Sequence, residues 1–344
     1  MSRIFPATRS GLALGFGGAP IGNMYSPISD GAAQTLLEAI HADGCATFDT
    51  APHYGNGRSE QRFGAFLAGI PRQSVVVSTK VGRLLRPDAN APRDFGAYVD
   101  VLPNVQYFDY SGPGVRRSIE DSLTRLGLTH IDIAYVHDCS VMTHGERAPS
   151  VLRQVIAEAI PELERLRGEG LIRHIGVAVS HWQACVAVLR EAHVDCLLLA
   201  GRYTLLDQNA LPELLPLCEA RGVRIALGGV FNSGILATGV ARSAQPRRFN
   251  YEPASAELVA RVAALESICE RHAVPLRAAA LQFPLAHPAI EVVLAGVKSI
   301  GHWQDAVVKM RYAIPQEFWQ ALRRERLIPD AAPTPITAVA ALAH

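Results

Sequence analysis

Short apolar runs, many of them rich in β-branched residues, alternate along the chain with longer segments of helical periodicity. Runs such as Val75–Val81 and Ile131–His137 are almost continuously hydrophobic, which is typical of parallel strands covered by helices on both faces. The predicted strands are Leu12–Gly17, Ala46–Asp49, Val75–Val81, Ile131–His137, Ile172–Val179, Cys196–Ala200, Val223–Leu227 and Glu291–Ala295. Eight such strands predict an α/β fold, the (β/α)8 TIM barrel.

The intervening segments place apolar residues on one helical stripe, and several end in glycine. The predicted helices are Ser29–Ala42, Arg58–Leu67, Gly114–Leu126, Val151–Arg167, His181–Ala192, Ala210–Ala220 and Glu257–His272. An open doubly wound sheet would normally carry a GxGxxG turn after its first strand, and the glycines at 15, 17, 18 and 22 lack that spacing. We therefore expect one barrel domain over residues 1–344.

Two long stretches interrupt the alternation, residues 83–112 and 233–253. Loops of this length in a compact domain are usually functional, so both are expected to cover the site. The Ala- and Pro-rich tail after Ile328 is expected to be either a third lid or a flexible end.

Charge and cysteine usage exclude several classes of function. The chain has 33 Lys and Arg against 32 Asp and Glu, so it lacks the basic excess expected of a nucleic-acid or membrane-surface binder. Its 6 cysteines form no CxxC pair and no metal-finger spacing, which predicts buried thiols and no metal site. With no apolar run long enough for a membrane span or signal peptide, we expect a soluble cytoplasmic protein.

Ionisable residues stand at the predicted carboxyl ends of three strands, where the active sites of such barrels lie. Asp49 ends one strand, Lys80 the next and His137 the one after, and Tyr54 follows Asp49 in the connecting loop. A lysine after an apolar strand is desolvated and needs a partner, for which Asp49 is suited. Its charge is expected to lower the pKa of Tyr54, making the phenol an acid/base, with His137 orienting the substrate oxygen.

These residues lie in the segments TFDTA (47–51), YGNGRSE (54–60), STK (78–80) and YVH (135–137). The segments resemble the signature segments of the aldo-keto reductases, and the resemblance runs from about Leu14 to Val308. It implies a (β/α)8 barrel that binds a nicotinamide dinucleotide without a Rossmann fold. It also implies a catalytic tetrad of Asp49, Tyr54, Lys80 and His137.

The resemblance assigns the cofactor contacts as well. Ser180 matches the position that binds the carboxamide, and Lys298 and Ser299 match the phosphate-binding segment. NADP-preferring members have an arginine where this chain has Gln304, so NAD is the expected cofactor and NADP the alternative. Further contacts are expected from three residues in the later loops, Gly228, Asn232 and Gly234, although Gly228 replaces the tyrosine that usually stacks on the nicotinamide.

Within the family, FDYS (108–111), AGRYTLLD (200–207) and GGVFNSGIL (228–236) resemble the aldose 1-dehydrogenase branch, which includes L-fucose, L-galactose and pyridoxal 4-dehydrogenases. Members of that branch oxidise cyclic hemiacetals to lactones. We expect a sugar such as L-fucose or another D-threo-aldose, bound at a polar rim of His53, Asp138 and Arg202. Pyridoxal and general aldehyde reduction remain the alternatives within the family.

Other reaction classes also stay open at this point. Lys80 or Lys298 could form a Schiff base in a lyase, and His53, His137 and Asp138 could hold a metal in a hydrolase, although no HxH pair anchors one. A non-catalytic accessory subunit that keeps the nucleotide is the further alternative. The sequence does not indicate an oligomeric state.

Overall fold

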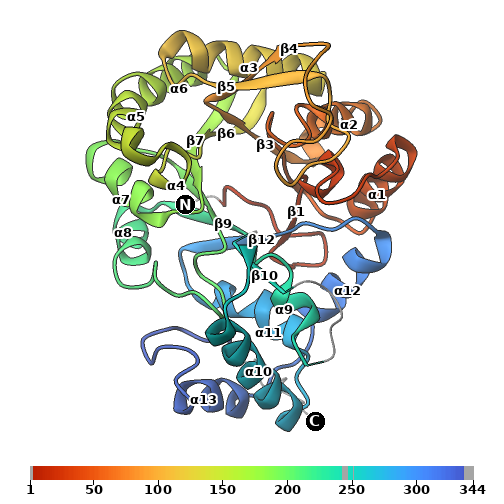
Figure 1. Cartoon of the computed structure of the whole chain (residues 1–344), viewed down its shortest axis with the longest axis vertical. Helices are drawn as coiled ribbons and strands as arrows, with labels where there is room; N and C mark the ends of the chain where they lie inside the picture. The colour runs from red at the N-terminus through yellow and green to blue at the C-terminus, as the bar shows by residue number, and fades with distance from the viewer. Residues whose placement is uncertain (1–2, 242–246, 251, 337–344) are drawn as a thin grey trace.

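The computed structural model describes residues 3–241, 247–250 and 252–336. Its centre is a closed barrel of parallel strands in the order β1-β2-β3-β6-β7-β8-β9-β12 (Figure 1). The barrel strands are β1 (Leu14–Gly17), β2 (Thr47–Asp49), β3 (Val76–Val81), β6 (Ile131–His137), β7 (Ile172–Val179), β8 (Cys196–Ala200), β9 (Arg224–Gly228) and β12 (Ile290–Ala295). The predicted (β/α)8 fold and all eight of its predicted strands are confirmed, three with the predicted bounds and five with bounds shifted by one or two residues.

Helices surround the barrel (Figure 1). The longer ones are α1 (Asp30–Ala42), α2 (Arg58–Leu67), α3 (Gly112–Leu126), α5 (Ala148–Gln154), α6 (Ile160–Gly168), α7 (Trp182–Glu191), α8 (Leu214–Arg221), α10 (Ala256–Arg271), α11 (Leu276–Gln282), α12 (Ile300–Met310) and α13 (Gln316–Arg324). The sequence analysis missed α11, α12 and α13. In α11 an alanine run is buried almost throughout, so it shows little of the polar-apolar alternation on which the prediction depended.

The predicted helix Val151–Arg167 is interrupted by a π-helical turn at Val155–Ala159, between α5 and α6. Pro161 stands in the first turn of α6 and has no N–H to donate to the preceding turn. The N–H of Ile160 instead reaches back five residues to the carbonyl of Val155. The proline thus explains why one sequence pattern becomes two helices joined by a wider turn.

Both expected loop regions contain secondary structure. Residues 83–112 include an antiparallel hairpin of β4 (Arg83–Pro87) and β5 (Asn104–Phe108), in which Arg83 pairs with Phe108. Residues 233–253 include α9 (Ile235–Thr238) and the short strands β10 (Arg248–Phe249) and β11 (Glu252–Pro253). A short helix, α4 (Val141–His144), follows β6. The β4–β5 hairpin projects at the top of the barrel in Figure 1.

The amino-terminal segment closes the end of the barrel opposite these loops. Phe5 is 1% exposed and packs with Tyr135, Leu198 and other side chains that face the barrel interior. The backbone N–H groups of Ile4 and Phe5 donate to Oε2 of Glu291, at the start of β12, at 3.2 and 3.3 Å. This segment supplies the floor beneath the barrel core.

The tail beyond Ile328 packs against α13 as far as the structure describes it. Arg323 donates to the carbonyl of Ala332, which is fully buried, and Gln316 donates to the carbonyl of Pro335. Residues 337–344, which belong to the tail expected to form a lid or a flexible end, lie outside the described residues.

All six cysteines are buried and unpaired, as expected of internal thiols. In the described part of the chain, no three histidine, cysteine, aspartate or glutamate side chains gather as metal ligands do. None of the described helices has the length and apolar character needed to cross a membrane.

Removing the Phe5 ring should destabilise the fold, because it empties the floor of the barrel. We expect Phe5→Ala to lower the free energy of unfolding by about 3 kcal/mol, measured by urea denaturation followed by tryptophan fluorescence. Val308→Ala on the exposed face of α12 is the control and should change it by less than about 0.5 kcal/mol. Equal stability of the two variants would contradict the role given to Phe5.

Candidate active site

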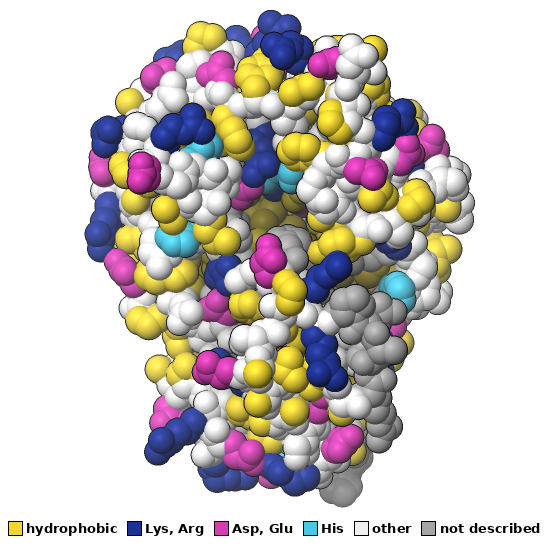
Figure 2. All heavy atoms as spheres, in the orientation of Figure 1, with side chains coloured by type: hydrophobic (Ala, Val, Ile, Leu, Met, Phe, Trp, Pro, Cys, Tyr) yellow, Lys and Arg dark blue, Asp and Glu magenta, His cyan; other side chains and the backbone are white. Residues whose placement is uncertain are grey.

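A cavity of about 780 Å³ opens at the carboxyl ends of the barrel strands, within the usual size range of small-molecule sites. Tyr54, Lys80 and His137 line it together with residues of the loop before β5 and of the β10–β11 segment. Figure 2 shows the hollow on this face, with basic and histidine side chains in its wall. The strand ends therefore meet as the barrel prediction requires.

Lys80 and Asp49 form a buried ion pair on neighbouring strands. Nζ of Lys80 lies 2.7 Å from Oδ2 of Asp49 and 2.8 Å from the carbonyl oxygen of Thr50, and the two charged side chains are 1% and 4% exposed. The Ser78 hydroxyl donates to the other carboxylate oxygen at 2.7 Å. Burial raises the pKa of Asp49, and the neighbouring ammonium opposes that rise. The carboxylate fixes where the lysine charge stands.

Tyr54 lies directly over this ammonium, in the loop after β2. Nζ of Lys80 is 4.6 Å from the centre of the Tyr54 ring. The loop can sit this deep because Gly22 has no side chain: a Cβ there would lie 2.6 Å from the carbonyl carbon of Tyr54. The phenol ring is thus held over a fixed positive charge.

Two histidines complete the wall beside Tyr54. The His137 ring meets the Tyr54 ring edge-on with centres 6.4 Å apart, and the His53 ring lies 5.8 Å from that of His137. Burial, the Arg83 guanidinium and the Lys80 ammonium lower the pKa of His53 to about 3, and the same causes lower the pKa of His137 well below its usual value. Both imidazoles are therefore neutral near pH 7 and can accept as well as donate hydrogen bonds.

Arg83 is a cavity residue that the sequence analysis did not single out. Its Nη2 lies 2.5 Å from Oδ2 of Asp138, the residue after His137, and its guanidinium stacks 5.0 Å from the centre of the Phe108 ring. Burial raises the pKa of Asp138, and Arg83 opposes that rise. Its position two residues after the end of β3 was the only sign in the sequence that Arg83 reaches the site. Its pairing with Asp138 is visible only in the folded structure.

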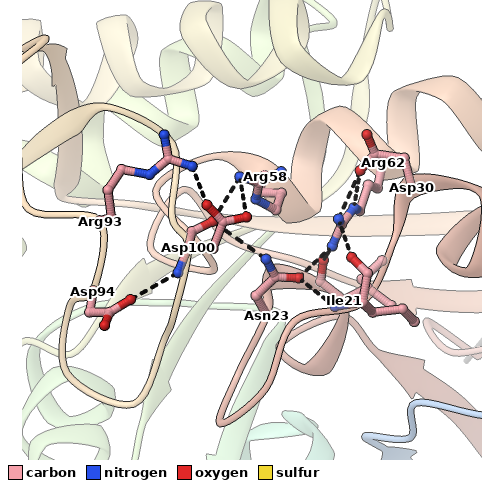
Figure 3. A network of polar contacts seen from close by, with 9 residues as sticks. Ile21, Asn23, Asp30, Arg58, Arg62, Arg93, Asp94 and Asp100 are labelled. Atoms are coloured by element: carbon pink, nitrogen blue, oxygen red, sulfur yellow. Dashed lines mark hydrogen bonds and ion pairs between the residues drawn. The ribbon is translucent and has the colours of Figure 1, made fainter.

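The loop before β5 is held across the site by a polar network (Figure 3). Arg58 donates to the backbone oxygen of Asp100 at 2.7 Å, and Arg93 forms an ion pair with the Asp100 carboxylate. Asn23, from the loop after β1, also donates to Asp100, and its side-chain oxygen accepts from Arg62 at 2.9 Å. The network fixes two loops to each other and to α2.

Residues 96–99 of this loop line the cavity, and one of them contacts Tyr54. Tyr98 is 3% exposed, and its ring stacks on that of Tyr54, with centres 6.1 Å apart and planes 23° apart. Since Tyr98 also lines the cavity, this loop forms the wall opposite the barrel strands.

Among the residues expected to hold a dinucleotide, Lys298 and Ser299 lie at the start of α12 and do not line the cavity. Ser180, at the end of β7, lines it. Lys298 binds the backbone oxygens of Met24 and Ser26, and Ser299 caps the N-terminus of α12 by accepting from the backbone at position 302. A cation, hydroxyls and a helix N-terminus are the donors that a phosphate needs. The start of α12 therefore fits a phosphate group of a dinucleotide. Gln304 is exposed on α12, one turn further on.

Arg202, predicted at the substrate rim, is engaged by other protein groups. It does not line the cavity; its Nη1 pairs with Asp207 at 3.0 Å, and its Nε donates to the carbonyl of Ser180 at 2.6 Å. The Asp207 carboxylate thus pairs with the guanidinium that was expected to contact a substrate hydroxyl. Arg202 instead supports Ser180 from behind.

Three further positions expected to contact the cofactor lie at or after the end of β9. Asn232 is 4% exposed, accepts from Thr204 at 2.7 Å and donates to the carbonyl of Gly201 at 3.2 Å, so its amide ties two loops together. Gly234 is the N-cap of α9, with φ 97°, and Gly228 ends β9. None of the three lines the cavity formed by the described residues.

Comparison with known proteins places this geometry in a family. A model described as the aldo/keto reductase family matches residues 13–325. The chain is 43% identical to pyridoxal 4-dehydrogenase from Microbacterium luteolum over 335 residues, which cover 93% of this chain and 96% of that protein. It is 39% identical to D-threo-aldose 1-dehydrogenase from a Pseudomonas species over 327 residues, which cover 92% and 94%.

A solved structure agrees in fold. The glycerol dehydrogenase of Gluconobacter oxydans superimposes with a TM-score of 0.71 over 94% of this chain and 96% of that one, at 22% identity. The family model covers most of the chain, and the signature segments meet around one cavity at the barrel mouth. The chain therefore belongs to the aldo/keto reductase family of oxidoreductases.

Proposed function

We propose that the protein oxidises the cyclic hemiacetal form of a sugar to its lactone, with a nicotinamide dinucleotide as hydride acceptor. The observation that carries the proposal is the Tyr54 ring held 4.6 Å from a buried, carboxylate-paired Lys80 in the floor of the cavity. The names of two relatives support the reaction class, since one acts on D-threo-aldoses at carbon 1 and the other on pyridoxal. Aldoses and pyridoxal both form internal hemiacetals in water.

In this reaction Tyr54 takes the proton of the anomeric hydroxyl while the hydrogen on the same carbon leaves as hydride, so that the C–O bond becomes the lactone carbonyl. Lys80 stabilises the phenolate that must accept the proton, and Asp49 keeps the ammonium in place. The neutral His137 orients the reacting oxygen through one hydrogen bond. A bound nicotinamide supplies the hydride acceptor.

The cofactor would extend across the mouth of the barrel, from Ser180 after β7 to Lys298 and Ser299 at the start of α12. Ser180 is suited to hold the carboxamide, and Lys298 and Ser299 to hold a phosphate at the start of α12. The residue at position 304 is glutamine, which brings no charge to a second phosphate on the ribose. NAD is therefore the favoured cofactor and NADP the alternative.

The charges of the cavity wall favour an uncharged, hydroxyl-rich substrate. Lys80 is paired with Asp49, and Arg83 is paired with Asp138. Because these charges balance, this part of the wall offers a sugar hydrogen-bonding groups without a net charge. A second candidate, pyridoxal, is supported by the name of one relative and by the aromatic side chains of the cavity wall. Both candidates undergo the same hemiacetal oxidation.

We propose a cytoplasmic location, which the buried, unpaired cysteines support because they fit a reducing compartment.

A substrate panel tests the proposed reaction. Reduced-cofactor absorbance would be followed with NAD or NADP against L-fucose, D-arabinose, L-galactose and pyridoxal. We expect lactone formation with at least one aldose and a higher kcat/KM with NAD than with NADP. Absence of turnover with all four compounds and both cofactors would contradict the hemiacetal proposal, and turnover of pyridoxal alone would select the second candidate.

The role of Tyr54 is tested by Tyr54→Phe, which removes the hydroxyl and keeps the ring. Loss of an acid/base group should lower kcat at least about 100-fold, with the Kd of NAD within about twofold. Tyr312→Phe makes the same change at a tyrosine beyond the end of α12 and should retain kcat. Near-normal turnover by Tyr54→Phe would rule out the assignment.

A further inference from the structure

The mechanism above leaves His53 without a role, although its ring lines the cavity next to Tyr54. Its centre lies 5.2 Å from that of Tyr98 and 5.8 Å from that of His137. A neutral imidazole carries one hydrogen, on either Nδ1 or Nε2, and the bond made at one nitrogen decides what the other can do. The surroundings of His53 settle which nitrogen carries it.

The backbone carbonyl of Asn104 can only accept a hydrogen bond, and it lies next to the side-chain amide of Asn56. Nδ2 of Asn56 donates to the carbonyl oxygen of Asn104 at 2.8 Å, and Nδ2 of Asn104 donates back to the carbonyl oxygen of Asn56 at 2.9 Å. The reversed orientation of the Asn56 amide would set two oxygens against each other. Oδ1 of Asn56 therefore points the other way, as an acceptor.

That acceptor fixes Gln106, on β5 of the hairpin. The amide atom of Gln106 that lies 2.6 Å from Oδ1 of Asn56 must be the nitrogen, since only it can donate. Oε1 of Gln106 then faces Nδ1 of His53 at 3.0 Å. An amide oxygen accepts and cannot donate, so Nδ1 of His53 carries the hydrogen.

Arg83 does not compete for that hydrogen. Its Nη1 lies 3.4 Å from Nδ1 of His53, further than the Gln106 oxygen, and is a donor like the protonated Nδ1, while the neighbouring Nη2 donates to Asp138. The guanidinium charge instead opposes a second proton on the ring, and burial does the same: together with Lys80 they lower the pKa of His53 to about 3. His53 stays neutral, and its Nε2 holds a lone pair.

Nε2 is the atom with which the ring meets the cavity. Among the described residues it has no hydrogen-bond partner, and it is not one of the enclosed polar atoms there. We propose that Asn56 and Gln106 act as positioning residues that fix His53 as an acceptor, so that the substrate must present a hydroxyl donor to its Nε2. That the donor is a sugar hydroxyl rests on the proposed function. That His53 accepts the hydrogen bond rests on the chain of hydrogen bonds from Asn104 through Asn56 and Gln106.

An acceptor at Nε2 of His53 restricts which substituent the substrate can place against it. A hydroxyl on the substrate carbon facing His53 donates to Nε2, whereas a fluorine or a methoxy group at that carbon cannot donate. Replacing the hydroxyl by fluorine should therefore weaken binding about as much as removing it. Had Nε2 carried the hydrogen, fluorine or a methoxy oxygen could have served as an acceptor and would be tolerated better.

A spectroscopic test needs no substrate. In the ¹⁵N-histidine-labelled protein, long-range ¹H–¹⁵N correlations identify the tautomer of each ring, and His53→Gln assigns the His53 signals. We expect a protonated Nδ1 and a bare Nε2 in the wild type, and loss of that preference in Gln106→Leu. A bare Nδ1 and protonated Nε2 in the wild type would overturn the proposal, whatever the enzyme's activity.

A kinetic test asks whether the substrate uses the lone pair. With L-fucose and its 2-, 3- and 4-deoxyfluoro analogues, we expect one analogue to show a KM about tenfold higher than that of L-fucose, with kcat little changed. That penalty should vanish in Gln106→Leu and persist in Gln73→Leu, which makes the same change at an exposed turn before β3. A penalty unchanged in Gln106→Leu would overturn the positioning role.

The two tests separate the inference from the proposed function. If L-fucose and every compound of the panel are inert while the spectrum shows a bare Nε2, the proposed function fails and the fixed acceptor stands. If the panel is turned over and the spectrum shows a protonated Nε2, the proposed function stands and the inference fails.

Discussion

The buried pair of Lys80 and Asp49 sets the conditions for everything else in the site. Taking two charges out of water is costly, and removing either partner would leave the other uncompensated. The pair is tolerated because adjacent parallel strands present their carboxyl ends side by side, with the Ser78 hydroxyl and the Thr50 carbonyl completing its hydrogen bonds. A fixed ammonium at the bottom of a cavity can then act on whatever group lies above it, and in this chain that group is Tyr54.

The loops bring side chains to the site that the barrel strands do not carry. The β4–β5 hairpin brings Arg83 and Gln106 over the strand ends, and the network around Asp100 holds Tyr98 against Tyr54. The segment YGNGRSE contributes to the site and to the loops around it: Tyr54 lies over Lys80, Asn56 orients Gln106, and Arg58 binds the facing loop. Under the proposed function, the strand ends set the reaction type, and the hairpin with the loop it carries sets the choice of substrate.

Much of this arrangement could be predicted from the sequence, because strand ends in a barrel converge whatever the loops do. The positions of Asp49, Lys80 and His137 needed only the strand assignment. Arg202 and Asn232 could not be placed in this way, because their roles depend on Asp207 and Thr204, partners that become visible only once the loops are folded. Gln106 lay in a short strand of a stretch expected to be a loop, so its contact with His53 had no sequence signal.

The central claim is that the Lys80 charge keeps Tyr54 able to take a proton, and the pH dependence of Lys80→Met measures this most directly. In the wild type the rate of lactone formation should be near its maximum at neutral to mildly alkaline pH. Without the ammonium, the phenolate loses its stabilisation, so we expect kcat/KM at pH 7 to fall at least about 100-fold and the rising limb of the profile to move to higher pH. A variant whose rising limb coincides with that of the wild type would contradict the account.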